Sequence, residues 1–129
     1  MATVFNEFHH PSINLKKLVL LGSPNSLEVI MKDYKKLAGF NSKVYDGLDK
    51  LLKKLFGYHI ADFNVEDFAV NITAQTLILH DKSDLIVPFA AGNDIAQKIQ
   101  QATFIESKTG GHSLNTEENT NRIINFLRS

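Results

Sequence analysis

Acidic and histidine side chains follow two predicted strands at the points where those strands end. Asp84 comes shortly after the apolar run Thr76–His80, and His112 comes shortly after the run 103–106. In open α/β sheets the carboxyl ends of the strands share one edge, where ligands bind. A carboxylate beside an imidazole is the acid–base part of a hydrolytic triad, because the acid holds the imidazole tautomer while the imidazole moves the nucleophile's proton. We expect the side chains of Asp84 and His112 to lie within hydrogen-bond reach or one water beyond it.

Simpler interpretations of the same residues stay open. Asp84 is a residue type that caps the following helix, and His112 suits an ordinary turn. His80, Asp81 and Asp84 are possible metal ligands, but no second cluster of ligand residues supports them. The adjacent pair His9–His10 is a weaker candidate, since neighbouring side chains point in different directions. We therefore expect neither a metal nor a cofactor.

The elements that must position these residues are read from the hydrophobic pattern. Short runs with apolar residues at their centres predict strands at residues 18–21, 76–80 and 103–106. The first run is apolar throughout, which is typical of a strand inside a parallel sheet. The predicted order along the chain is strand, two helices, strand, helix, strand, helix. This order predicts an α/β fold in which a three-stranded parallel sheet is flanked by helices.

Local signals predict where the helices begin. Asn25, with Glu28 three residues later, predicts a capping box at the first helix, and Ser42 is the predicted cap of the second. The second helix carries an apolar stripe that either lines a pocket or packs in the core, namely Val44, Leu48, Leu51, Leu52 and Leu55. Pro88 suits the first turn of the next helix. The last helix is predicted to start near Asn115 and to bury Ile123, Ile124 and Leu127.

The segment Thr76–Pro88 resembles the α/β-hydrolase fold family, in which a late strand ends in His-Gly-x-x-Asp-x-x-Val-Pro. The resemblance implies that Asp84 is the triad acid, with Asp81 standing where Gly is commoner. Gly110-Gly111-His112 is similar to the family's catalytic histidine turn, which implies that His112 is the base. Upstream, Leu15–Pro24 is similar to the strand that precedes the family's lid.

The resemblance covers nearly the whole chain, from Ile13 to Leu127, and implies the C-terminal half of an α/β-hydrolase fold. We therefore expect residues 1–129 to form one partial domain. Within it, residues 13–24 are the expected strand and turn, and residues 25–70 are the expected lid-like helices. Residues 76–129 are expected to hold the acid and histidine strands and the C-terminal helix.

The family's nucleophile motif does not occur in this sequence. In that family a serine within Gly-x-Ser-x-Gly sits on a sharp turn after an earlier strand. The nearest pattern here is Gly22-Ser23-Pro24, in which Pro24 has no N–H for an oxyanion hole. The resemblance therefore implies part of a serine hydrolase for an ester, amide or similar acyl substrate, carrying Asp84 and His112 but inactive alone. The alternative is a non-catalytic, truncated domain that folds and self-associates.

Composition narrows the choice of partners and compartment. The chain has 129 residues, with 14 Lys and Arg against 14 Asp and Glu, and no Cys. The balanced charge predicts no nucleic-acid partner, and the apolar runs are too short for a membrane span. Met1–Phe8 lacks the pattern of a signal peptide, so we expect a cytoplasmic protein. The strand Leu18–Leu21 is expected to be an unpaired edge, apolar on both faces, through which the chain forms a homo-oligomer.

Overall fold

A computed structural model describes residues 14–39 and 41–129 of the chain, and the pair His9–His10 lies outside the described residues. The described residues form a sheet of three strands, β1 (Lys17–Leu21), β2 (Gln75–Asp81) and β3 (Ala102–Ser107). The order is β1–β2–β3, and both pairs are parallel. The predicted three-stranded parallel sheet flanked by helices is confirmed.

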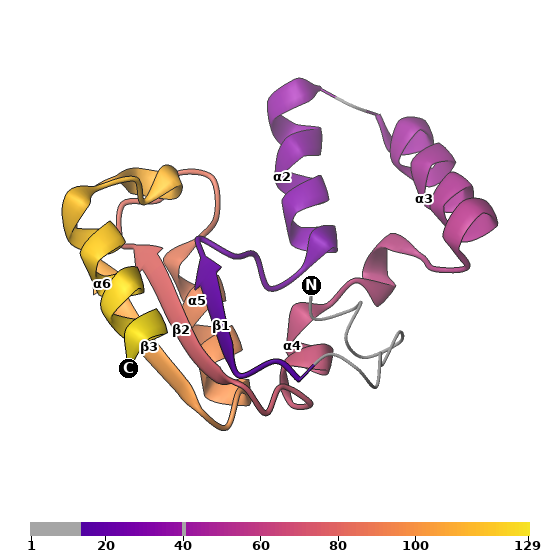
Figure 1. Ribbon diagram of the computed structural model, residues 1–129. Coiled ribbons are helices and arrows are strands. Elements are labelled where there is room, and N and C mark those ends of the chain that lie inside the picture. The colour runs from indigo at the N-terminus through magenta and orange to yellow at the C-terminus, as the bar shows by residue number, and fades with distance from the viewer. Residues whose placement is uncertain (1–13, 40) are drawn as a thin grey trace.

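Helices and short turns connect the strands (Figure 1). Between β1 and β2 the chain forms α2 (Leu27–Ala38), α3 (Ser42–Phe56), the 3-10 turn η1 (Ile60–Asp62) and α4 (Val65–Ala69). The helix α5 (Phe89–Lys98) joins β2 to β3, and the 3-10 turn η2 (Gly111–Ser113) and α6 (Glu117–Arg128) follow β3. None of the helices in the described part of the chain is both long enough and apolar enough to cross a membrane.

The central strand β2 is covered on both faces, which explains its unbroken apolar run. On one face Ile78 packs with Ala69 of α4 and Ile95 of α5. On the opposite face Leu79 packs with Leu114 and with the half-buried side of α6. Because successive strand residues point to opposite faces, a strand between two helical layers needs apolar residues at consecutive positions. The turn after β2 therefore starts from a firmly packed strand.

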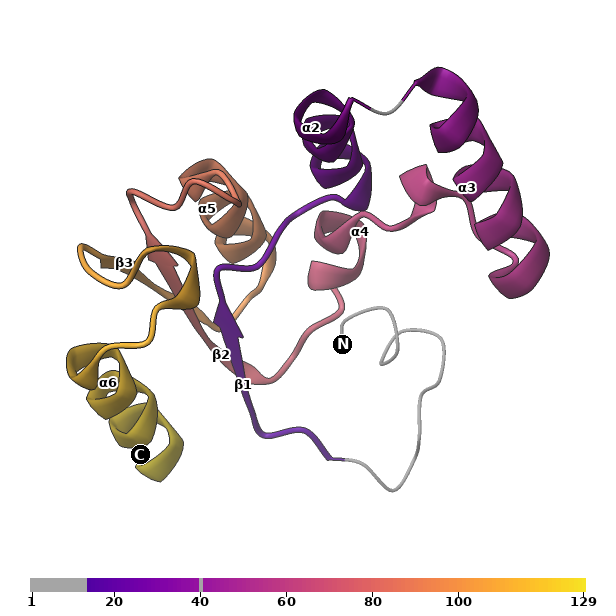
Figure 2. The ribbon, with the colours of Figure 1, turned by 90° about the horizontal axis from the view of Figure 1, so that it is seen from above.

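The helices α2 and α3 lie to one side of the sheet rather than over it (Figure 2). No residue of α3 is buried, and Val44 and Leu55 of its apolar stripe are 50% and 61% exposed. Two polar contacts join α3 to the following turn: Asp49 accepts the Ile60 N–H at 2.7 Å and lies 2.8 Å from His59 Nδ1. That residues 25–70 act as a lid stays a prediction.

The prediction that Asn25 begins a capping box is wrong. Ser26 is the residue at the start of α2, and its side chain makes no capping hydrogen bond. The Asn25 side chain instead donates to Glu66 at 2.9 Å and to Asp94 at 3.3 Å. These two carboxylates come from α4 and α5, so a contact between distant segments replaces the local cap.

The prediction that Ser42 caps the next helix is also wrong. Ser42 is the first residue inside α3, and Asn41 is the cap, since its side chain accepts the Val44 N–H at 3.1 Å. Both residue types are good caps, and the one that comes first in the chain is used here.

The buried side of α6 differs from the prediction in two of three positions. Ile123 packs against the sheet as expected, together with Phe126. Ile124 and Leu127, however, are 37% and 53% exposed. The side of α6 that faces the sheet is therefore centred on Ile123 and Phe126. The N-cap of this helix is Thr116, whose side chain accepts the Asn119 N–H at 3.2 Å.

Candidate active site

Asp84 and His112 lie together at the carboxyl ends of the strands. Asp84 is in the turn after β2, and His112 is in η2, after β3. His112 Nδ1 is 2.9 Å from Asp84 Oδ2. The other carboxylate oxygen, Oδ1, accepts the backbone N–H groups of Ile86 at 2.8 Å and Val87 at 2.9 Å. The predicted hydrogen-bond reach between the two side chains is confirmed, and their catalytic role stays a prediction.

The environment of Asp84 keeps its carboxyl group ionised. The side chain of Asp84 is fully buried, while that of His112 is 45% exposed. Burial alone would raise the pKa of Asp84, but hydrogen bonds from the Val87 N–H, from His112 and from the Ile86 N–H outweigh it, so the pKa lies below its ordinary value of 3.8. A carboxylate only accepts hydrogen bonds, so Nδ1 of His112 carries the hydrogen and Nε2 is the basic nitrogen.

A second histidine, His80, lies beneath the same carboxylate. Its side chain is fully buried, and Nε2 lies 3.1 Å from the Val87 carbonyl oxygen and 3.4 Å from Asp84 Oδ2. Both of these oxygens accept, so Nε2 carries the hydrogen. Nδ1 is buried without a partner and faces Gly92, where an added Cβ would overlap with it. This contact with the Asp84 turn was not predicted, since the sequence placed His80 at the end of the second strand, in the segment that resembles the hydrolases, and among possible metal ligands.

Gly22, directly after β1, lies beside the pair. Its N–H donates to the Leu79 carbonyl at 3.0 Å, and its φ is +51°. A Cβ at this position would lie 3.2 Å from the His112 carbonyl oxygen, 3.3 Å from His112 Nδ1 and 3.5 Å from Asp84 Oδ2. Glycine is therefore needed both for the backbone conformation and for the space beside the pair. The approach of Gly22 to the pair was not predicted, since the sequence indicated Gly22 as the end of a strand and as part of Gly22-Ser23-Pro24, the pattern nearest to the nucleophile motif.

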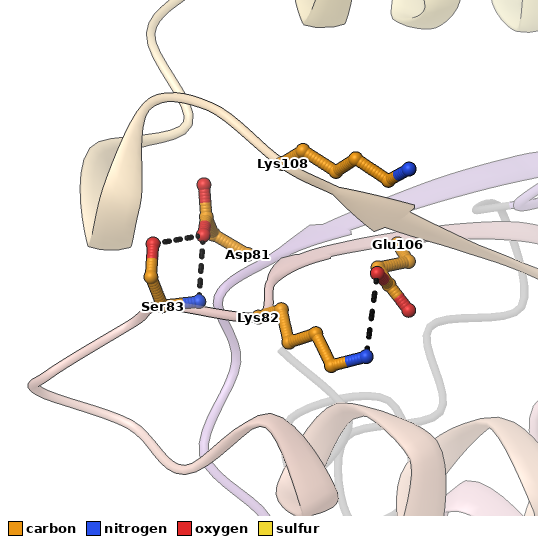
Figure 3. Close-up of a pocket in the computed structure, with 5 residues that line it drawn as sticks. All are labelled: Asp81, Lys82, Ser83, Glu106 and Lys108. Carbon is orange, nitrogen blue, oxygen red and sulfur yellow. Dashed lines mark hydrogen bonds and ion pairs between the residues drawn. The ribbon is translucent and has the colours of Figure 1, made fainter.

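Asp81 connects the two turns that carry the pair. Its Oδ1 accepts the N–H of Ser83 at 2.8 Å and the hydroxyl of Ser83 at 2.6 Å (Figure 3). Its Oδ2 accepts the Gly111 N–H at 3.0 Å. The Ser83 hydroxyl, followed by the Ser83 and Gly111 N–H groups, lowers the pKa of Asp81 from its ordinary value of 3.8.

Across the described residues, no three His, Asp or Glu side chains are grouped so that they could hold a metal ion.

A surface hollow of about 440 Å³ lies beside the pair and does not include it. The residues that line it are Asp81, Lys82, Ser83, Glu106 and Lys108 (Figure 3). Charged side chains dominate this lining, and Lys82 Nζ lies 3.8 Å from Glu106 Oε1. Since neither Asp84 nor His112 lines the hollow, we assign no acyl substrate to it.

Comparison with solved structures identifies the fold. The esterase EaEST from Exiguobacterium antarcticum matches 99% of this chain and 62% of its own length, with a TM-score of 0.63 and 18% sequence identity. The enol-lactonase from Burkholderia xenovorans LB400 matches 88% of this chain and 56% of its own, with a TM-score of 0.57 and 18% identity. The chain has the fold of part of an α/β hydrolase. The resemblance predicted from the residues before and after Asp84 and His112 is confirmed at the level of the hydrolase fold.

Curated sequence relatives also carry hydrolase names. A protein of Rhizobium rhizogenes named carbamate hydrolase RutD is 27% identical over 88 residues, which are 66% of this chain and 33% of the relative. The protein of the same name from Serratia proteamaculans is 29% identical over 82 residues, which are 62% of this chain and 30% of the relative. The chain therefore spans about a third of the length of the curated relatives that it matches. No protein-family model matches the chain.

Proposed function

We propose that this chain supplies the acid and the base of a serine hydrolase whose substrate is an ester, an amide or a similar acyl compound. The observation that carries the proposal is the 2.9 Å contact between His112 Nδ1 and Asp84 Oδ2 at the carboxyl end of the sheet of a hydrolase fold. The name of the curated relatives adds carbamates to this substrate class.

The proposed mechanism uses the free nitrogen of His112. His112 Nε2 takes the proton of a serine hydroxyl while the serine oxygen bonds to the substrate carbonyl carbon. Asp84 holds the Nδ1–H and stabilises the resulting imidazolium with its negative charge. His112 then gives the proton to the leaving oxygen or nitrogen of the substrate, while the bond between that atom and the carbonyl carbon breaks. Water attacks the acyl-enzyme by the same proton transfers and restores the serine.

The serine itself comes from a separate segment in this proposal. No serine of the sequence stands in Gly-x-Ser-x-Gly. Within residues 14–39 and 41–129, the hydrogen bond of the His112 ring goes to Asp84 and none joins it to a serine hydroxyl. A His–Asp pair without a nucleophile and oxyanion donors lacks the groups that stabilise the tetrahedral intermediate. We therefore propose that the chain alone is inactive.

An ester assay tests the inactivity of the chain alone. Turnover of a nitrophenyl ester is expected to be no faster than with the same concentration of free imidazole. Turnover that disappears in His112→Ala, and that a serine-directed phosphonate blocks, would show that the chain has a nucleophile of its own.

A chimaera tests the acid–base roles. Residues 14–129 replace the corresponding part of the Exiguobacterium antarcticum esterase, whose remaining segments are kept. Ester hydrolysis is expected to fall about 10⁴-fold or more in His112→Ala. The matched control is His59→Ala, since His59 also lies 2.8 Å from a carboxylate, that of Asp49, away from the site. A folded, active chimaera in which the two variants behave alike refutes the proposed function.

The free edge of β1 supports a second candidate, a domain that self-associates. β1 is an end strand of the sheet that the described residues form, and Leu21 is 42% exposed. The Lys16 carbonyl and the Gly22 N–H both bond to β2. Backbone groups alternate in direction along a strand, so the N–H and C=O of Val19 point to the free edge. We propose that a second copy pairs there in a two-fold dimer.

Sedimentation tests this self-association. The intact chain is expected to run as a dimer or larger species at micromolar concentration. Val19→Pro removes an N–H from the free edge and leaves the bonds to β2 intact, so it is expected to run as a monomer. A stable monomer for the unaltered chain, or a Val19→Pro variant that associates equally well, contradicts the proposal.

A further inference from the structure

We infer that Asp81 is a positioning residue that holds the His112 turn against the Asp84 turn. The inference rests on the proposed function, in which His112 is the general base. Asp81 itself does not contact the reacting atoms, since its two carboxylate oxygens bind Ser83 and Gly111. It acts through the position of the residue next to Gly111, which is His112.

The backbone and the side chain of Asp81 reach the two turns separately. Its backbone carbonyl accepts the Asp84 N–H at 3.1 Å, which closes the turn that carries the acid. Its carboxylate reaches across to β3's turn and accepts the Gly111 N–H at 3.0 Å. Asp81 itself is buried, and its bond to Gly111 is partly buried. One residue therefore contacts both the acid's turn and the histidine's turn.

The histidine turn needs such a contact because its backbone conformation is unusual. Gly110 and Gly111 have φ values of +105° and +54°, in the region that favours glycine. At the far end of the turn, Asn119 of α6 donates to the Leu114 carbonyl at 3.1 Å. At the near end, among the described residues, the Gly111 N–H is held by Asp81. Before His112 the Thr109 carbonyl also accepts the Ser107 hydroxyl at 2.8 Å, but that bond stays on the β3 side. The bond to Asp81 is the one that ties the Gly111 backbone to the end of β2.

The chemistry of a carboxylate suits this place better than that of other side chains. Both oxygens accept, Oδ1 from two donors of Ser83 and Oδ2 from Gly111. A glycine at position 81 would keep the backbone contact with Asp84 and lose the contact with Gly111.

Amide hydrogen exchange, measured by NMR on the full chain, tests the inference without substrate. In Asp81→Gly the exchange of the Gly111 amide is expected to accelerate about tenfold or more, since it loses a hydrogen bond to a charged group. The His112 Nδ1–H resonance, which reports the bond to Asp84, is expected to broaden or disappear. Asp81→Ala is the second variant, and it is expected to give the same two changes without the added backbone freedom of glycine.

Two controls separate positioning from general destabilisation. Ser83→Ala removes a donor from the same carboxylate and leaves the Gly111 bond, so Gly111 is expected to stay protected. The Thr76 amide, which donates to the Gln101 carbonyl at 2.8 Å, reports the intact sheet and is expected to be unchanged in every variant. If Gly111 stays protected and the His112 resonance stays sharp without the Asp81 carboxylate, the inference is wrong, while the ester assays still decide the proposed function. An active chimaera in which His112→Ala and His59→Ala behave alike, combined with fast Gly111 exchange in the Asp81 variants, would instead refute only the function.

Discussion

Substitution of Gly22 by alanine should destabilise the protein more than the same substitution at Gly111. Gly22 has a φ of +51°, and an added Cβ would lie 3.2 Å and 3.3 Å from atoms of His112. Gly111 provides a matched control, because its φ is +54° and nothing lies within 4 Å of an added Cβ. The two alanine variants therefore share the same backbone strain, and only Gly22→Ala adds the close contacts.

The expected magnitudes follow from these two contributions. A left-handed conformation costs an ordinary residue about 1–2 kcal/mol, which is the whole expected effect of Gly111→Ala. Forcing a methyl group into packed atoms adds about 1–3 kcal/mol, so Gly22→Ala is expected to cost about 2–5 kcal/mol in free energy of unfolding. With an m-value of about 1.5 kcal/mol per M, an extra 2 kcal/mol lowers the urea midpoint by about 1.3 M.

Urea denaturation, followed by circular dichroism, measures the difference between the two variants. The His112 Nδ1–H resonance, recorded without denaturant, is expected to shift in Gly22→Ala because the methyl group pushes against the bond to Asp84. Equal urea midpoints for Gly22→Ala and Gly111→Ala would refute the claim that a side chain at position 22 collides with His112.

Three further predictions concern other parts of the molecule. Folding lowers the pKa values of Asp81 and Asp84, so both carboxylates stabilise the folded state above about pH 3.8. This contribution is lost as the pH falls through the pKa values of the folded state, and the unfolding free energy measured at a series of acidic pH values will detect the loss. Gly92→Ala is expected to cost about 2–3 kcal/mol, and less in a His80→Ala background, as a double-mutant cycle in urea will show. Lys17→Met removes a 2.7 Å bond to the Phe126 carbonyl, so amides in the last turn of α6 are expected to exchange faster.

The parts of the fold that could be predicted from sequence are those set by local pattern. Residues 77–79 are apolar at consecutive positions because β2 is buried on both faces, and this pattern can be recognised in the sequence. The placement of Asp84 and His112 after successive strands was also readable, since parallel strands bring their carboxyl ends to one edge. The hydrogen bond between the two side chains followed from that topology.

The parts that could not be predicted depend on contacts between distant segments. Asn25 is a good helix cap by type, but carboxylates from two later helices bind its side chain instead. The close approach of Gly22 to His112 exists only once β1 has been placed beside β2. Similarly, a stripe of leucines in α3 indicates an amphipathic helix and does not say whether a neighbour covers it.

The very different lengths of the two crossovers have a consequence for the order of folding. Residues 22–74 separate β1 from β2, whereas residues 82–101 separate β2 from β3. Closing the longer segment costs about 0.9 kcal/mol more in chain entropy, before any helix within it contributes. Contacts close in sequence form faster, so β2, α5 and β3 are expected to pair first and β1 to dock last. Asp84 and His112 both belong to the early unit, so the pair meets before Gly22 arrives beside it.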